Sequence, residues 1–395
     1  MISSTSCSSR LLRCSAVFSL ALSLSGCVSG GQRVGDLPAP LDAGGHYRLA
    51  LFPIDNESGA RAFARTLGEE LRNVLSAAGM ELVSDEELNR FLARHRIRYV
   101  SGVDQEVAKA ARNDLGVKGI LIPSVEQQDL APVPRIELTM RLVSTDDEPQ
   151  VLWMGGIGSA GDEAPGLLGL GIVSDSRKLE DREFGRLATS LSEYLGGRGS
   201  RSRPCPAEAR FRPNILFRAE DLETAIPHSV VVFPFVNESD RRNAGTVVAL
   251  EFLRQLSSVD NLRVVEPGVV RDRLLKLRIV LEGGVSLDTA RVMLAQTDAD
   301  LVLAGYVHEY ADPPAGTSSA PRVSFTVFML ERRNQKVIWQ ASSHHEGNDR
   351  VFFFGAGSVG TAIGLTCRMA RNAIDSLMAA DGKTRTDGNR SHATP

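Results

Sequence analysis

Three glycines near the carboxyl end have the spacing of a dinucleotide-binding loop. Gly355, Gly357 and Gly360 fit the pattern G-x-G-x-x-G within the stretch VFFFGAGSVG. Such glycines turn the chain tightly, let backbone amides approach a pyrophosphate, and pack a helix against a sheet. The motif also needs a second parallel strand after the helix, ending in an acidic residue about 20 positions further on. Here one predicted helix and a polar tail follow Gly360, so we predict no nucleotide site and no cofactor.

Other residues that could do chemistry form no catalytic or metal-binding pattern. His344, His345, Glu346 and Asp349 come nearest to a metal-ligand set, and a polar turn carrying a histidine pair is the simpler interpretation. The sequence has no G-x-S-x-G, no H-E-x-x-H and no P-loop lysine. Because an enzyme needs a nucleophile with its base, a metal set or a phosphate loop, we predict that the protein is not an enzyme and binds no metal.

The amino terminus has the features of a secretory signal. Arg10 and Arg13 precede an apolar run from Ala16 to Leu24, which is shorter than the roughly 20 apolar residues that span a bilayer. The run ends in LSGC, which resembles the bacterial lipobox, whose cysteine is acylated before the signal is removed. This resemblance implies that residues 1–26 are a signal peptide and that the mature chain begins at lipidated Cys27. Val28, in place of an aspartate, implies the outer membrane, with the body facing the periplasm.

The composition is that of a globular protein, which fits the lipid anchor that the lipobox resemblance implies. The chain has 395 residues, 43% of them hydrophobic and 24% charged, and a net charge of -3. That charge gives no basic field, so we expect no nucleic-acid partner. Cys7 and Cys14 leave with the signal and Cys27 carries lipid, so two cysteines remain in an oxidising compartment. Cys205 and Cys367 could form a disulfide or remain two unpaired thiols, and the spacing does not decide between these alternatives.

The chain contains two copies of one unit. The stretch RLALFPIDNESG returns as VVVFPFVNESDR, and RIELTMRLV returns as RVSFTVFML. The two tryptophans of the chain fit the same alignment, in VLW and VIW. Each copy is the size of a domain and should have a hydrophobic core of its own. The predicted divisions are a signal peptide (1–26), a flexible tether (27–45), a first α/β domain (46–195), a Pro/Gly/Arg-rich linker (196–227), a second α/β domain (228–380) and a disordered tail (381–395).

Each copy has the same predicted order of elements. A short buried strand, an amphipathic helix, a short strand and two helices precede a meander of three strands and a final helix. This order predicts an α/β fold, with two tandem duplicated α/β sandwich domains built on mixed sheets. The strands are predicted at 49–53, 81–83, 119–125, 135–143 and 150–154, and again at 229–234, 262–265, 301–308, 322–331 and 336–341. The last three helices of each copy are predicted at 86–94, 105–114 and 178–195, and again at 269–277, 287–295 and 360–378.

Two pairs of segments are candidate contact sites. Asn56 and Asn237, each in an Asn-Glu-Ser turn before a helix, could bind an anionic group, although helix capping or turn closure is the default. An apolar, glycine-rich loop leads into the last helix of each copy, and it either packs on its own sheet or contacts a partner, a second subunit or the membrane surface. The apolar residues of these loops are Leu167, Leu168, Leu170, Phe352, Phe353 and Phe354.

The order of parts resembles a known group of periplasmic domains. A strand ending in Phe52-Pro53 before Asn56, and again in Phe233-Pro234 before Asn237, is similar to the TolB amino-terminal domain and to the curli-secretion lipoprotein CsgG. The resemblance implies a non-catalytic protein that works by contacts in secretion, surface-structure or cell-wall assembly. Its partners would be envelope proteins or further copies of itself.

Three possibilities stay open beside an assembly factor. A component of a CsgG-like secretion pore would need membrane hairpins with about 9 to 11 alternating residues per strand. The corresponding segments, 155–173 and 342–359, are glycine-rich without clean alternation, which weighs against a pore. The chain could also be an envelope enzyme or a nucleotide-binding protein, and the absence of the corresponding motifs weighs against both.

Overall fold

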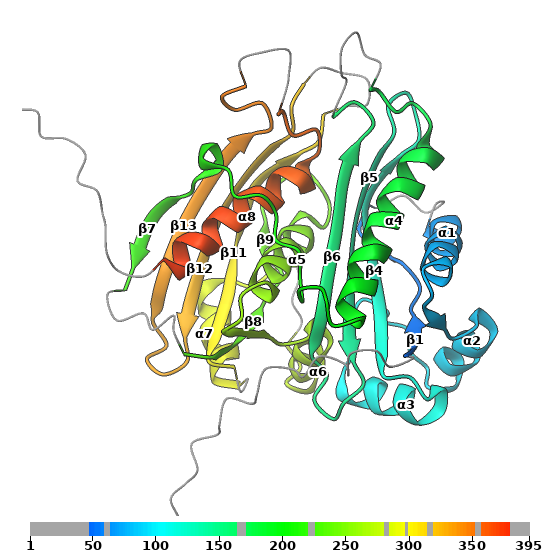
Figure 1. Ribbon diagram of the computed structural model, residues 1–395. Helices are drawn as coiled ribbons and strands as arrows, with labels where there is room; N and C mark the ends of the chain where they lie inside the picture. The colour runs from blue at the N-terminus through cyan, green and yellow to red at the C-terminus, as the bar shows by residue number, and fades with distance from the viewer. Residues whose placement is uncertain are drawn as a thin grey trace, which may run out of the picture. The chain divides into compact units, whose positions relative to one another are not determined.

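The computed structural model describes residues 47–58, 64–163, 171–219, 226–279, 284–296, 299–313, 319–351 and 357–379. The chain divides into two units by contacts, residues 1–35 and 36–395, and all described residues belong to the second. That unit is an α/β structure with two mixed sheets that form two α/β domains (Figure 1). The predicted fold class is therefore confirmed. No helix among the described residues is long and apolar enough to cross a membrane.

The first domain has the strand order β3-β1-β4-β5-β6, with β2 beside β4. β1 runs parallel to β3 and β4, whereas β4, β5 and β6 form an antiparallel meander. Its elements are β1 (Arg48–Leu51), β2 (Asp55–Asn56), α1 (Ala64–Ala77), β3 (Glu81–Leu82), α2 (Asp85–Arg94), α3 (Gln105–Leu115), β4 (Gly119–Asp129), β5 (Arg135–Ser144), β6 (Val151–Ala160) and α4 (Ser176–Leu195).

The second domain repeats this plan and adds one strand. The order is β10-β8-β11-β12-β13-β7, with β9 beside β11. Its elements are a 3-10 turn (Ala209–Phe211), β7 (Asn214–Arg218), β8 (His228–Val232), β9 (Val236–Asn237), α5 (Ala244–Ser257), β10 (Leu262–Val264), α6 (Pro267–Lys276), α7 (Leu287–Gln296), β11 (Leu301–Ala311), β12 (Arg322–Glu331), β13 (Val337–Glu346) and α8 (Ala362–Met378).

Helices cover both faces of each sheet, and this explains the apolar periodicities of the sequence. In the first domain α1 and α4 enclose a core that includes Trp153 and Phe184, while α2 and α3 enclose another with Phe52 and Phe91. Burying one such side chain contributes about 1.5–3 kcal/mol. Trp339 is fully buried in the second domain, as Trp153 is in the first. The shared position of the tryptophans agrees with the duplication.

Several helices are capped by the side chain of the residue that directly precedes them. Ser84 Oγ accepts from the amide of Glu87 at 3.3 Å, and Asp104 Oδ1 accepts from that of Val107 at 2.9 Å. Thr361 does the same for α8, with its Oγ1 3.1 Å from the amide of Gly364. Each cap satisfies an amide that the helix itself leaves without a partner. These helices therefore begin close to where the sequence predicts.

The last strand of each meander is longer than predicted. β6 continues to Ala160 and β13 to Glu346, so His344, His345 and Glu346 lie in a strand and not in a turn. The ladder explains this correction, because β13 pairs with β12 as far as Arg322 and Glu346. Polar residues on a partly solvated sheet face do not interrupt such pairing.

The segment predicted as a linker is packed against the second domain. β7 pairs with β13 in antiparallel orientation, and Phe211 is fully buried. Cys205 and Cys367 form a disulfide, with their Cα atoms 5.8 Å apart. The two cysteines are therefore paired and not free thiols.

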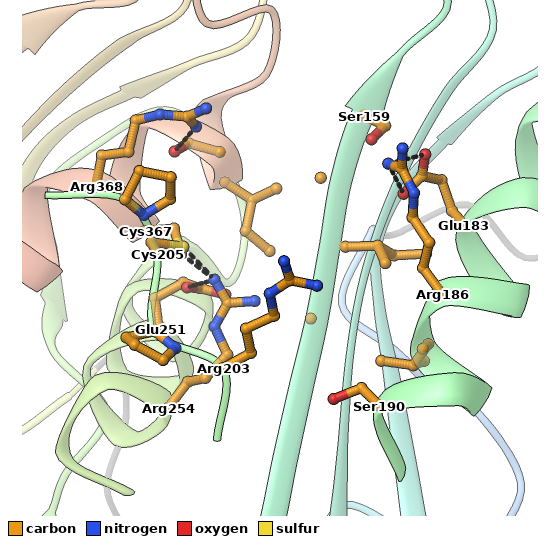
Figure 2. Close-up of a pocket in the computed structure, with 18 residues that line it drawn as sticks. Ser159, Glu183, Arg186, Ser190, Arg203, Cys205, Glu251, Arg254, Cys367 and Arg368 are labelled. Atoms are coloured by element: carbon orange, nitrogen blue, oxygen red, sulfur yellow. Dashed lines mark hydrogen bonds and ion pairs between the residues drawn. A yellow bond between two sulfur atoms is a disulfide. The ribbon is translucent and has the colours of Figure 1, made fainter. Parts of the chain in front are cut away.

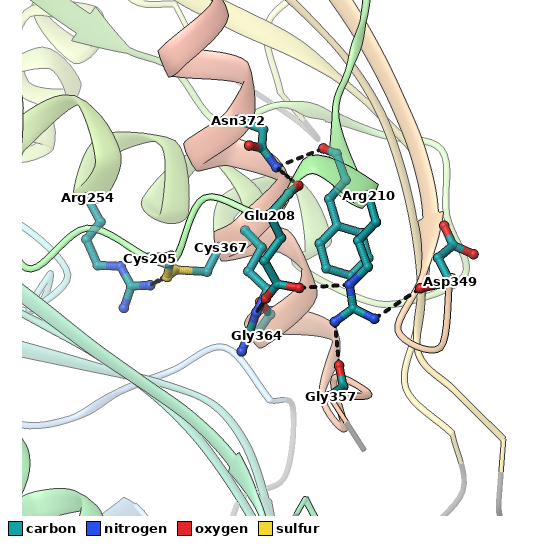
Figure 3. Close-up of polar contacts among 11 residues, drawn as sticks. Cys205, Glu208, Arg210, Arg254, Asp349, Gly357, Gly364, Cys367 and Asn372 are labelled. Carbon is teal, nitrogen blue, oxygen red and sulfur yellow. Dashed lines mark hydrogen bonds and ion pairs between the residues drawn. A yellow bond between two sulfur atoms is a disulfide. The ribbon is translucent and has the colours of Figure 1, made fainter. Parts of the chain in front are cut away.

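Arg210 and Asn372 bind the same segment to the second domain (Figure 3). Arg210 pairs with Glu208 at 2.7 Å and donates to the carbonyl oxygens of Asp349 and Gly357. Asn372 on α8 donates to the carbonyl oxygen of Glu208 at 2.8 Å. These contacts bind the described residues 208–211 of the connecting segment to the second domain.

Candidate functional site

Most predicted contact residues lie outside the described part of the chain. Cys27, both apolar loops and Gly355 fall there; the loop residues are Leu167, Leu168, Leu170, Phe352, Phe353 and Phe354. Of the three glycines, Gly357 has a φ of 84°, in the left-handed region, and Gly360 precedes α8. Both therefore lie in the turn that leads into α8.

Asn56 and Asn237 close equivalent turns. Asn56 Oδ1 accepts from the amide of Ser58 at 3.1 Å and from its hydroxyl at 2.6 Å. Asn237 Oδ1 accepts from the amide and hydroxyl of Ser239 at 3.2 and 2.7 Å. Helix α5 begins at Ala244, after Asn243, so Asn237 does not cap that helix. The shared turn accounts for the repeated Asn-Glu-Ser, because an asparagine side chain can bond the backbone two residues on.

One group of side chains has the connectivity of a nucleophile, base and orienting acid. Thr326 Oγ1 lies 2.9 Å from His308 Nε2, and His308 Nδ1 lies 2.7 Å from Glu238 Oε2. Thr326 lies on β12, which pairs with β11 on one side and β13 on the other. The backbone amides around Thr326 are therefore used in hydrogen bonds between strands. Amides engaged in this way cannot stabilise an oxyanion. The equivalent pair in the first domain is Thr139 and Glu126, 2.8 Å apart, which indicates a cross-strand structural bond.

The two domains meet through a polar interface that contains a buried ion pair. Arg141 on β5 contacts Glu266, the cap of α6, at 3.2 Å, and both side chains are almost fully buried. Glu266 also accepts from the amide of Val103 at 3.2 Å. Losing one member of such a pair would leave an uncompensated buried charge, which costs about 3–5 kcal/mol. This pair therefore fixes how the domains fit together.

Carboxyl groups gather along the same interface. Burial raises the pKa of Glu126 and of Glu137 well above the ordinary value, and Asp312 raises that of Glu137 further. Burial, then the nearby Asp55, raises the pKa of Glu57 to about 8. Asp55 and Glu57 line a cavity of about 230 Å³ between the domains. The interface therefore holds protonated carboxyl groups at pH values at which exposed ones are ionised.

A larger cleft of about 500 Å³ lies between the domains (Figure 2). β6 and α4 of the first domain form one side of it, and α5 and α8 of the second domain form the other. The connecting segment around Arg203 and Cys205 completes the lining. The cleft thus exists only when both domains are in place. Six charged side chains line it, which makes it a candidate site for a polar ligand.

Arg254 is the central charged residue of this cleft. Only 6% of its side chain is exposed, and its Nη2 lies 2.9 Å from Glu251 Oε2 and 2.8 Å from Cys205 Sγ. Its Nη1 lies so close to Gly156 on β6 that a Cβ there would collide with it. Burial raises the pKa of Glu251, while Arg254 opposes that shift. Glycine at position 156 is therefore what lets the guanidinium reach the cleft.

Three further arginines surround Arg254. Arg186 on α4 pairs with Glu183 at 3.0 Å, and Arg368 on α8 pairs with Glu208 at 2.6 Å. Arg203 is exposed and makes no polar contact among the described residues. Figure 2 shows its guanidinium beside that of Arg254, directed into the cleft. The cleft therefore has one arginine whose charge is not neutralised.

The same residues do not form a favourable metal site. Sγ of Cys205, Sγ of Cys367 and a carboxylate oxygen of Glu251 lie within 4.8 Å of one another. The sulfurs are joined in a disulfide, whereas metals bind thiolates. The Arg254 guanidinium already contacts this group and would repel a cation. Its chemistry suits an anion better than a metal.

The outer edge of the second sheet is a different kind of surface. β7 pairs with β13 on one side and with no strand of the described residues on the other. Three successive apolar residues on it, Ile215, Leu216 and Phe217, are 40%, 51% and 47% exposed. Natural edge strands are usually protected by charge, proline or a cover. An apolar edge of this kind is typical of a contact surface.

The fold and the cleft define an α/β protein with two mixed sheets. No protein-family model and no curated protein matches the chain. A solved structure, the PelC dodecamer from Paraburkholderia phytofirmans, is similar over 45% of this chain and 95% of that one, with 16% identity and a TM-score of 0.26.

Two further structures are similar over a smaller part of the chain. Lipoprotein GNA1162 from Neisseria meningitidis matches 30% of this chain and 81% of its own, with 26% identity and a TM-score of 0.24. The LpoB C-terminal domain from Salmonella enterica matches 30% and 88%, with 21% identity and a TM-score of 0.25.

No pattern in the sequence predicts the cleft. Arg203 lies in a segment that has no apolar periodicity, and Arg254 and Glu251 lie on a helix that looks amphipathic by itself. The available signal was the repeated arginine of GRGSRSRPC, because closely spaced like charges repel each other and a nearby anion relieves that repulsion. Only the packing of the two domains brings Arg203 and Arg254 together.

Proposed function

We propose that this protein is a lipid-anchored, non-catalytic factor of the bacterial envelope that binds other proteins during assembly. Cys27 would carry the anchor at the outer membrane, with the two domains in the periplasm. Its partners would be envelope proteins, and further copies of the same chain are the second possibility. The proposed role covers secretion, surface structures and cell-wall assembly, without choosing among them.

The observation that supports this function best is the exposed apolar edge strand β7. An edge strand offers unpaired backbone groups, and an extended segment of a partner can add to it as a further strand. Main-chain hydrogen bonds would give affinity, while the side chains of Ile215 and Phe217 would give specificity. The disulfide and the Arg210 contacts hold the segment before β7 in place, which lowers the entropic cost of binding.

Photo-crosslinking from β7 in living cells tests this function. With a benzophenone amino acid in place of Leu216, we expect a distinct adduct of the lipidated full-length chain with an envelope protein. The matched control carries the same group in place of Leu275, an equally exposed leucine on α6. An adduct of twice the chain's mass would identify a second copy as the partner.

A second variant shows whether the apolar edge is responsible. Leu216→Asp should abolish the adduct formed from a crosslinker at position 217, because it places a charge on the docking edge. Circular dichroism would show that the variant is folded. The proposal fails if positions 216 and 217 give no more adduct than position 275.

A further inference from the structure

The cleft between the domains contains more positive than negative groups. Its lining includes four arginines, Arg186, Arg203, Arg254 and Arg368, but only the carboxylates of Glu183 and Glu251. Each carboxylate already has an arginine partner within 3.0 Å. Arg203 is left without a counter-ion among the described residues. The surplus charge is therefore concentrated where Arg203 meets Arg254.

These two arginines are placed for a shared ligand. Arg254 is held from behind by Glu251 and the disulfide through Nη2, so that its position is fixed before any ligand arrives. Its Nη1 makes no hydrogen bond among the described residues and lies against Gly156. The guanidinium of Arg203 is directed toward the same space (Figure 2). Two like charges side by side repel each other unless an anion lies between them.

The number of free donors favours one class of anion. A phosphate monoester carries about 1.5 to 2 negative charges near pH 7 and three terminal oxygens, so it can accept from Arg203 and from Nη1 of Arg254 at the same time. A carboxylate has two oxygens and a single charge, and it would engage these two guanidinium groups less completely. The planar guanidinium also presents paired donors that fit phosphate oxygens.

The rest of the cleft could hold the organic part of such a ligand. Ser159 on β6 and Ser190 on α4 line it opposite the connecting segment, and Ile157 and Ile363 add apolar surface. The volume of about 500 Å³ lies within the range of small-molecule sites, which is about 300–1,000 Å³. A compact polar molecule such as a sugar phosphate would fill it.

We propose that the cleft between the two domains binds a small phosphate monoester, with Arg203 and Arg254 as the phosphate-binding residues. Because both domains contribute to the lining, bound ligand would favour the assembled pair of domains over separated ones. This site is distinct from β7, and its occupancy does not depend on the protein partner proposed above.

Calorimetric titration of the full mature chain in detergent micelles tests the site. The probes are glucose 6-phosphate, inorganic phosphate and glucuronate, which carries one carboxylate. We expect saturable binding of glucose 6-phosphate that weakens with added salt, and clearly weaker binding of glucuronate. Arg203→Gln should weaken the phosphate ester about tenfold, the loss of one charge-assisted hydrogen bond.

The controls separate a specific site from general attraction to arginines. Arg177→Gln removes an exposed arginine of α4 that does not line the cleft, and it should leave binding unchanged. Because Arg203 makes no polar contact among the described residues, its replacement should not alter the unfolding temperature without ligand. The proposal is overturned if no saturable binding occurs, if glucuronate binds equally well, or if the two variants behave alike.

Discussion

Glu57 shows how the interface between the domains changes the chemistry of a single residue. It follows the short strand β2, and its backbone oxygen accepts from Nδ2 of Asn243 in the other domain at 3.3 Å. Burial and the neighbouring Asp55 raise the pKa of its carboxyl to about 8. The folded protein therefore keeps a proton there that the unfolded chain releases near the ordinary value of 4.5.

The sign of the resulting pH dependence is opposite to that of a salt-bridged carboxylate. The contribution of protonated Glu57 to the free energy of unfolding is complete below pH 4.5. It is lost as the pH rises through about 8. Glu57→Gln cannot ionise, so we expect its unfolding temperature to rise relative to the wild type as the pH increases over this interval. Thermal unfolding monitored by circular dichroism measures the difference.

The control for this prediction is Glu69→Gln, on the exposed side of α1, where the side chain of Glu69 is 61% exposed. The difference in unfolding temperature between this variant and the wild type should change little with pH over the same interval. If the difference for Glu57→Gln were equally independent of pH, Glu57 would not be protonated in the folded protein.

Sequence patterns predicted residues whose role is local, and they missed those whose role depends on the other domain. Asn56 and Asn237 could be placed in turns because an asparagine bonds its own neighbourhood. The place of the Arg254 guanidinium in the cleft depends on Gly156 and Cys205, which are both distant from it in the sequence. No local periodicity of the sequence indicates a contact between residues so far apart.

At the scale of elements, the regular helices and strands were predicted well and the connecting segment was not. The helices α2, α3 and α4 and the three-stranded meanders begin within a few residues of their predicted positions, because their apolar spacing matches one buried face. β7 was missed because its short apolar run is surrounded by proline and arginine. Pairing with β13 decides its structure.

The disulfide should contribute strongly to the stability of this segment. It joins cysteines separated by 162 positions, and in the chain-entropy account a loop of that size is worth on the order of 5 kcal/mol. Removing a native disulfide typically costs about 2–5 kcal/mol. We therefore expect the double variant Cys205→Ser, Cys367→Ser to lose free energy of unfolding in that range, measured by urea denaturation.

Reduction of the wild type provides the matching measurement. Wild-type protein treated with a reductant should unfold at the urea midpoint of the double variant, while the same reductant should not affect the variant. Thiol titration of the unfolded, unreduced wild type should detect no free thiol at Cys205 or Cys367. Finding two thiols there would contradict the disulfide.

For the whole molecule, the two domains have equivalent folds but different surroundings. The alignment that places Asn56 opposite Asn237 also places Glu69 of α1 opposite Leu250 of α5. Glu69 is exposed, whereas Leu250 is 7% exposed because α5 also packs against β6 of the first domain. Val151 and Met154 of β6 belong to the core that α5 and α8 enclose. The two domains therefore differ in what covers the equivalent helix: α1 has an exposed face, whereas α5 is covered by β6.

This divergence predicts that the domains stay together after the chain between them is cut. A protease site inserted between Gly199 and Ser200 leaves Cys205 and Cys367 in the same fragment, so the disulfide cannot hold the two parts together. The buried Arg141–Glu266 pair and the shared core should do so instead. We expect the cut protein to elute as one species with the mass of the intact chain and to unfold in a single calorimetric transition.

The carboxyl-terminal fragment expressed alone should aggregate, because Leu250 and Leu253 on α5 would then face water. Two fragments that separate as folded monomers would instead mean that each domain is complete by itself, and the cleft between them would then be an incidental gap.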